Sequence, residues 1–135
     1  MSKQCNTPHR DQGNPELAQF FTPAPVAKFM WQAVQLFCDG GLGTGVKIID
    51  PAAGKGSILD VVLSQGEVPT RSVYGIEIDP GLEKQRVGKT CRARFFTGDG
   101  LLDEFPGVDP GSFDLVIGNP PFGRLGDILP RQAIE

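Results

Sequence analysis

The chain has 135 residues, a formal net charge of −3 and three cysteines. This length supports about one domain, and a free-standing nucleic-acid-binding module usually carries a basic patch that this charge does not suggest. Cys5, Cys38 and Cys91 lie far apart without a Cys-x-x-Cys pair, which argues against a disulfide framework or a zinc site and favours a reducing compartment.

The N-terminal residues lack the apolar core of a signal peptide, and no apolar run approaches the ~20 residues of a membrane span. We therefore expect a cytoplasmic protein without membrane contact. Residues 1–16 are polar and rich in Asn, Gln and Pro, which predicts a mobile tail ahead of a folded part, 17–135. The single His9 is interpreted as a solvated residue of this tail, and no metal site is expected.

The first folded element is an amphipathic helix. Apolar residues recur at helical spacing over 23–38, between a start signal at Thr22-Pro23 and a stop signal at Gly40-Gly41. From residue 46 the pattern changes to short apolar strands that alternate with helical stretches. Strands are predicted at 46–50, 72–79, 94–97 and 113–118, and helices at 57–66, with Ser57 as a candidate N-cap, and at 80–93. Such βαβ units over 46–119 predict an α/β fold with a parallel sheet.

The stretch "DPAAGKG", Asp50 to Gly56, lies at a predicted strand-to-helix junction, where a glycine turn lets a ligand approach the backbone. It is not a P-loop, because Ile49 stands five residues before Gly54 and a glycine follows Lys55. It also lacks the third glycine of a dinucleotide fingerprint. A plain tight turn remains an alternative.

Three predicted strands end in acids: Asp50, then Glu77 and Asp79, then Asp99. The carboxyl ends of parallel strands line one edge of an open sheet, which is the binding edge. A carboxylate at the second strand end suits the two hydroxyls of a ribose, and one at the third suits an exocyclic amino group. Any one of these acids alone could be a solvated strand end.

The stretch "VIGNPPFG" follows the fourth predicted strand directly. Proline cannot donate to a sheet ladder, so Asn119-Pro120-Pro121 ends the strand. This segment is either a rigid stop or part of an active site.

The chain resembles the catalytic domain of the N6-adenine DNA methyltransferases with gamma-type motif order, found in type I modification subunits and many type II enzymes. The matching segments run in order from residue 20 to 123: "FFTPAPVAKFM", "IIDPAAGKGSIL", "VYGIEIDP", "TGDG" and "FDLVIGNPPFG". The resemblance implies a Rossmann-like sheet that uses S-adenosylmethionine, of which 17–135 would be the N-terminal part, ending after the fourth strand.

The resemblance also implies roles for individual residues. Those at the cofactor would be Thr22 over the methionine end, Asp50 with Ala52, Gly54 and Gly56 around the amino-acid moiety, Glu77 at the ribose, Ile78 beside it, and Asp99 at the adenine amino group. Those at the target adenine would be Asn119, Pro120, Pro121 and Phe122.

The amine of adenine is a poor nucleophile, because its lone pair is delocalised into the ring. The Asn119 side-chain carbonyl and a backbone carbonyl of Pro120 or Pro121 can each accept a hydrogen bond from one N–H group of this amine. Two such bonds favour tetrahedral geometry at the amine nitrogen. The prolines supply carbonyls without competing N–H donors. Phe122 offers a face on which an extruded base can stack.

The chain departs from the family at Lys55, where a small residue is usual, and at Ile58, where many members have an aromatic. Few residues follow the Asn-Pro-Pro-Phe motif, so we expect a fragment, or a subunit completed by a specificity or restriction subunit or by self-association. Double-stranded DNA would then be bound largely by other parts. Two alternatives remain open: a methyltransferase for a protein glutamine amide or an RNA amine, and an inactive cofactor-binding or assembly fragment.

Overall fold

The computed structural model describes residues 19–38, 42–43, 45–65, 68–109 and 111–122. They fall into two compact units. One is Thr22–Pro120, and the other is described at Gln19–Phe21 and Pro121–Phe122. The predicted tail, 1–16, lies outside the described residues.

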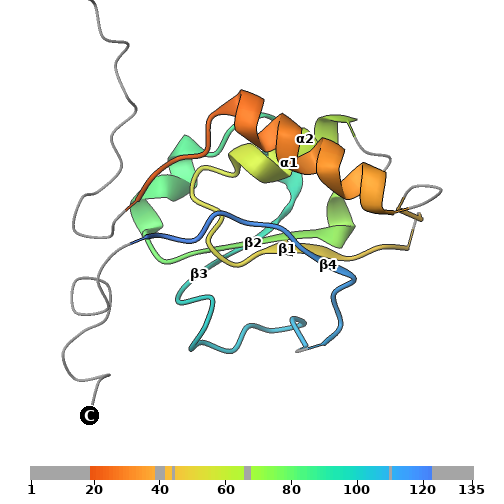
Figure 1. Cartoon of the computed structure of the whole chain (residues 1–135). Helices are drawn as coiled ribbons and strands as arrows, with labels where there is room; N and C mark the ends of the chain where they lie inside the picture. The colour runs from red at the N-terminus through yellow and green to blue at the C-terminus, as the bar shows by residue number, and fades with distance from the viewer. Residues whose placement is uncertain (1–18, 39–41, 44, 66–67, 110, 123–135) are drawn as a thin grey trace, which may run out of the picture. The chain divides into compact units, whose positions relative to one another are not determined.

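The larger unit is built on a parallel sheet of four strands in the order β3-β2-β1-β4 (Figure 1). The strands are β1 (Ile48–Asp50), β2 (Val73–Glu77), β3 (Arg94–Thr97) and β4 (Leu115–Val116). The chain runs outward from β1 to β3 and then crosses to the other side of β1 to form β4. This reversal makes a topological switch point between β1 and β4, and ligands bind outside the carboxyl ends of the strands at such a point.

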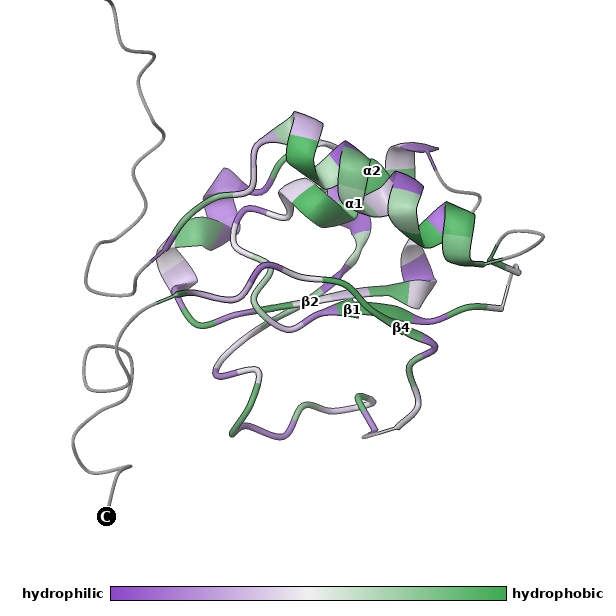
Figure 2. Cartoon of the chain, in the orientation of Figure 1, coloured by the Kyte–Doolittle hydropathy of each residue, from purple (hydrophilic) through white to green (hydrophobic). Residues whose placement is uncertain are grey.

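Helices α1 (Ala24–Phe37) and α2 (Ser57–Gln65) lie together on one face of the sheet (Figure 1). Polar and apolar residues alternate along both helices (Figure 2), as expected for elements with one buried side. From α1, Ala27 and Trp31 are buried in the core that the helices form with the sheet. Ile58 is also buried in this core.

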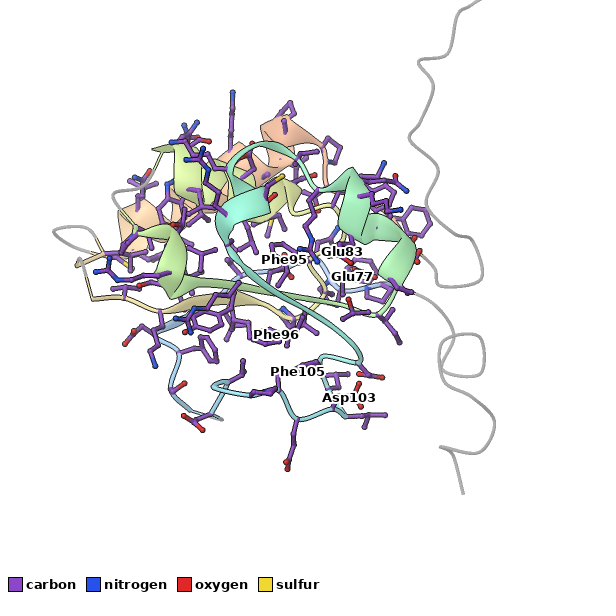
Figure 3. The ribbon with its side chains drawn as sticks, turned by 180° about the vertical axis from the view of Figure 1, so that it is seen from behind. Glu77, Glu83, Phe95, Phe96, Asp103 and Phe105 are labelled. Carbon is purple, nitrogen blue, oxygen red and sulfur yellow. The ribbon has the colours of Figure 1, made fainter. Side chains whose placement is uncertain are left out.

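A second apolar cluster covers the opposite face of the sheet. Strand residues Tyr74 and Phe96 pack there against side chains of the segment between β3 and β4. The Phe96 and Phe105 rings lie 5.4 Å apart, and Phe113 meets Tyr74 edge to face at 5.1 Å. Figure 3 shows Phe95 on the helix side of β3 and Phe96 on the side of Phe105. Both faces of the central strands are therefore covered, as parallel sheets require.

The α/β class, the parallel sheet and the first helix are as predicted from the sequence. The fourth strand, predicted over 113–118, is shorter than expected, although one further bond, from the N–H of Ile117 to the carbonyl of Ile49, continues its pairing with β1. Ser57 is the first residue of α2 rather than its N-cap. Among the described residues, no helix is both long and apolar enough to cross a membrane.

The helix predicted over 80–93 is wrong. Two 3-10 helices, η3 (Pro80–Gln85) and η4 (Gly88–Arg92), stand in its place. They are separated by extended backbone at Val87, and η4 begins at Gly88, which has a positive φ of 55°. The cause is tertiary: the Asp60 carboxylate of α2 accepts a 2.7 Å hydrogen bond from the backbone N–H of Lys89.

Gly88 offers a test of this packing. A Cβ at Gly88 would overlap the Asp60 carboxylate and would also stand at a positive φ. We expect Gly88→Ala to lower the free energy of unfolding by roughly 2–4 kcal/mol, from left-handed strain of about 1–2 kcal/mol plus the weakened Asp60 hydrogen bond. Urea denaturation measures the change.

The matched control is Gly107→Ala, because Gly107 has a φ of 75° but no neighbour within 4 Å of an added Cβ. It should show the backbone strain alone, about 1–2 kcal/mol. Equal losses in the two variants would contradict a role for the Asp60 contact.

Candidate functional site

The predicted site residues of the larger unit gather at the carboxyl edge of the sheet. Asp50 and Glu77 are the last residues of β1 and β2. Asp99 follows β3 after one further glycine, and Asn119 follows β4 after Ile117 and Gly118. Because the strands are parallel, all four positions lie at the same end of the sheet.

Glu77 ties the glycine turn to β2. One carboxylate oxygen accepts the backbone N–H of Gly54 at 2.7 Å, and the other accepts that of Asp79 at 2.9 Å. A second tie runs from the N–H of Ala53 to the carbonyl of Ile76 at 2.8 Å. The Glu77 carboxylate therefore fixes the position of the turn against the end of β2.

Asp50 is the buried acid of the site, with 1% of its surface exposed. Burial raises the pKa of its carboxyl from 3.8 to about 7; the hydrogen bond from Ala52 lowers it and the charge of Glu77 raises it. The Ala52 N–H donates to Asp50 Oδ1 at 3.0 Å. A Cβ at Gly118 would lie 2.6 Å from the same oxygen. The carboxyl of Asp50 therefore lies between the turn after β1 and the segment after β4.

The glycine turn is shaped by hydrogen bonds within the protein. Gly54 and Gly56 have φ angles of 55° and 84°, which glycine adopts without strain. The Gly56 N–H donates to the carbonyl of Ala53, and the carbonyl of Lys55 accepts from Val87 at 3.1 Å. An added Cβ at Gly56 would come within 3.0 Å of the Thr90 side chain, so close packing also requires glycine there.

The Asp99 side chain closes the turn that follows β3. Its Oδ1 accepts the N–H groups of Leu101 at 2.8 Å and Leu102 at 3.3 Å. At Gly100 an added Cβ would overlap the carbonyl oxygen of Pro51. Since β2 lies between β1 and β3 in the sheet, this contact brings the turns after β1 and β3 together across the carboxyl end of β2.

Ile78 adds an apolar surface next to Glu77. Its side chain is 51% exposed at the same end of β2. An exposed apolar side chain beside an acid suits a ligand with a flat ring joined to a sugar.

Thr22 and Asn119 meet at the switch point although they are 97 residues apart. The Asn119 side-chain Nδ2 donates to Thr22 Oγ1 at 3.3 Å, and both residues are half-buried. Pro120 follows Asn119 and is exposed. Pro121 and Phe122 belong to the other compact unit, in which the Phe122 side chain is 70% exposed.

Two site residues were not singled out from the sequence. Gly100 allows the turns after β1 and β3 to touch, and Gly118 allows the segment after β4 to pack on Asp50. The sequence feature that could have identified them is a glycine directly beside a candidate acid or amide, in "GDG" and "IGN". In the part of the chain that the structure describes, no group of three or more His, Cys, Asp or Glu residues is arranged to hold a metal ion.

Comparison with solved structures gives methyltransferases of the same fold. PH1948 from Pyrococcus horikoshii, described as a "putative RNA methyltransferase", is 24% identical, with a TM-score of 0.62 over 84% of this chain and 54% of that protein. The methyltransferase subunit of a type I restriction-modification system from Streptococcus thermophilus is 27% identical, with a TM-score of 0.58. That comparison covers 76% of this chain and 23% of the subunit.

The chain thus spans about half of one of these proteins and about a quarter of the other. No protein of curated function matches the chain. The family model for the N-6 DNA methylases matches residues 10–127, which is most of the chain. The resemblance seen in the sequence is therefore confirmed, and the chain belongs to the N-6 DNA methylase family.

Proposed function

We propose that this chain binds S-adenosylmethionine at the carboxyl edge of its sheet and forms the site that transfers a methyl group to the N6 amine of adenine in DNA. One observation carries the proposal: in a member of the N-6 DNA methylase family, acids end β1 and β2, Asp99 follows β3, and Asn119 follows β4, all at one edge of the sheet. The cofactor supplies a sulfonium methyl group when it is bound.

The residues present fit the cofactor. Glu77 lies at the carboxyl end of β2, and its carboxylate is a suitable acceptor for the two hydroxyls of the ribose. Ile78, half exposed beside it, packs against the adenine ring, and Asp99 accepts from the adenine amino group. Asp50 in its ionised form pairs with the ammonium group of the methionine end.

The glycine turn serves as a preformed wall for the methionine end. The N–H groups of Ala52, Ala53, Gly54 and Gly56 already donate within the protein. The carboxylate of the cofactor therefore takes its donors from the first turn of α2, whose positive dipole end favours an anion. Thr22 covers the same end from the start of α1.

Asn119 holds the amine that is methylated. Its side-chain carbonyl and the backbone carbonyl of Pro120 or Pro121 accept the two N–H bonds, which directs the nitrogen lone pair at the methyl group. Phe122 stacks on the base once it is extruded from the duplex. Positioning of this kind supplies up to roughly 7–11 kcal/mol of the barrier reduction.

DNA recognition depends on more than this chain. A net charge of −3 does not suit phosphate binding, so we propose that double-stranded DNA is held by other polypeptide segments. A specificity or restriction subunit, or a second copy of the chain, would supply them. The cytoplasm is the expected compartment for such a complex.

The deciding experiment is calorimetric titration with S-adenosylmethionine, followed by transfer of a tritiated methyl group to DNA, RNA and protein substrates. Labelled N6-methyladenine in DNA supports the proposal. Transfer to an RNA amine or to a glutamine amide shows that the substrate is that group and not adenine in DNA. Binding without transfer makes the chain a cofactor-binding module. A folded chain that does not bind the cofactor overturns the proposal.

The assignment of Glu77 has its own test. Glu77→Gln replaces one acceptor oxygen by a donor, and we expect cofactor affinity to fall at least about tenfold, which is about 1.4 kcal/mol. Glu83→Ala, at an exposed acid of η3, is the control and should bind as the wild type does. Unchanged affinity in Glu77→Gln contradicts the ribose assignment, provided that urea denaturation shows a folded variant.

Asn119 is tested by separating binding from transfer. We expect Asn119→Ala to reduce the rate of methyl transfer at least about 100-fold, because it removes one of two acceptors at the amine. Cofactor affinity should stay within about twofold, since the side chain is assigned to the target base. Gln32→Ala, at an exposed amide of α1, should change neither value. Transfer that survives in Asn119→Ala removes Asn119 from the mechanism.

The buried Asp50 predicts how stability depends on pH. Its pKa is about 7 in the folded chain, against 3.8 for the unperturbed carboxyl, so the folded state holds the proton that the unfolded state loses between these values. Stability therefore falls as pH rises through this window, by up to roughly 4 kcal/mol for about three pKa units.

Asp50→Asn removes this titration and keeps an oxygen that can accept from Ala52. The variant should be more stable than the wild type at pH 8, and this advantage should shrink towards pH 4. Urea denaturation at several pH values measures the difference in free energy of unfolding between the two proteins. Titration of the other carboxylates affects both proteins equally and so drops out of this difference. A difference that does not change with pH rules out the raised pKa.

A further inference from the structure

One side-chain hydrogen bond joins the start of α1 to the segment after β4. Asn119 Nδ2 donates to Thr22 Oγ1 at 3.3 Å. Thr22 lies two residues before α1, and Asn119 lies three residues after β4. Both belong to the same compact unit.

Each partner is held by a separate anchor. On the Thr22 side, Pro23 has its φ at −62°, and its carbonyl accepts the first N–H groups of α1, from Val26 and Ala27. Ala27 and Trp31 then bury this helix in the core. The position of the threonine hydroxyl is therefore set by the packing of α1.

On the other side, Gly118 precedes Asn119 and lies against the buried Asp50 carboxyl. The N–H of Ile117 donates to the carbonyl of Ile49 at 3.0 Å, which continues the pairing of β4 with β1. The backbone of Asn119 is therefore positioned by the centre of the sheet. The 3.3 Å hydrogen bond links two parts that are fixed independently.

The chemistry of the amide gives this bond a consequence. A primary amide is planar, with two N–H donors on nitrogen and acceptor lone pairs on oxygen only. When the nitrogen faces Thr22, the oxygen faces the other way and can accept from an amine. In the flipped orientation the N–H groups would meet the N–H bonds of the amine, and no hydrogen bond could form.

We propose that Thr22 is a positioning residue for Asn119: its hydroxyl holds the side-chain amide, and by accepting from Nδ2 it leaves Oδ1 to face the target amine. This inference rests on the proposed function, and it deepens that function by giving Thr22 a role toward the target base rather than toward the cofactor alone. Thr22 itself forms no bond to the reacting atoms in this role.

The test compares Thr22→Val, which removes the hydroxyl at nearly constant shape, with Thr22→Ser, which keeps it. In nitrogen-15 NMR spectra of the full chain, we expect Thr22→Val to shift the two side-chain Nδ2 proton signals of Asn119 and Thr22→Ser to restore them. In transfer assays with saturating cofactor, Thr22→Val should lower kcat about tenfold, and Thr22→Ser should restore it.

Thr70→Val is the matched control. Thr70 also adjoins a proline, but it lies in η2 (Thr70–Ser72), before β2 and so at the amino edge of the sheet. This variant should leave the Asn119 signals and kcat unchanged. Urea denaturation of all three variants shows that each is folded.

Two results overturn the inference. One is a Thr22→Val variant with unchanged Asn119 signals, and the other is a higher Kd for the cofactor together with an unchanged kcat, which would make Thr22 a cofactor contact only. Failure of the proposed function is seen separately, as absence of transfer by the wild-type chain. That result removes the catalytic consequence as well, while the NMR signals still decide whether Thr22 orients the amide.

Discussion

The Glu77 carboxylate is bonded to the backbone on both sides, and the candidate site depends on this arrangement. It joins the turn after β1 to the end of β2, through Gly54 and Asp79. A bond from the N–H of Ala53 to the carbonyl of Ile76 also ties this turn to β2. A side chain expected to bind a ligand therefore also builds the wall of the site. These two roles require an acid at position 77, because the side-chain amide of Gln or Asn has only one acceptor oxygen.

The same edge of the sheet contains groups that cost stability. Asp50 is buried and its pKa is raised to about 7, so its ionised form is unfavourable in the folded chain. Gly100 and Gly118 must lack a side chain, because a Cβ at either position would overlap the neighbouring segment. Costs of this kind are common at functional sites, where geometry matters more than stability. The core between the helices and the sheet supplies the compensation, because buried apolar area is the main favourable contribution to folding.

The errors made from the sequence have a common physical cause. The stretch 80–93 has enough helix-forming residues to predict a helix, but the Asp60 carboxylate captures the N–H of Lys89, and Gly88 adopts a positive φ. A hydrogen bond from another element outweighs weak local propensity. The fourth strand is short for a related reason, because after Ile117 the chain packs on Asp50 at Gly118 and leads into two prolines. Neither contact is visible in a local pattern.

The sequence by itself determined the α/β class, the family, the parallel sheet and the strand ends that carry acids. The class, the sheet and the strand ends follow from periodicity and turn chemistry, which are local along the chain, and the family follows from the resemblance of its motifs in their order. Only the tertiary structure decided that Glu77 holds the glycine turn, that the turns after β1 and β3 touch at Gly100, and that Thr22 meets Asn119. Such contacts join residues far apart in sequence, and they depend on the order β3-β2-β1-β4 and on how α1 packs.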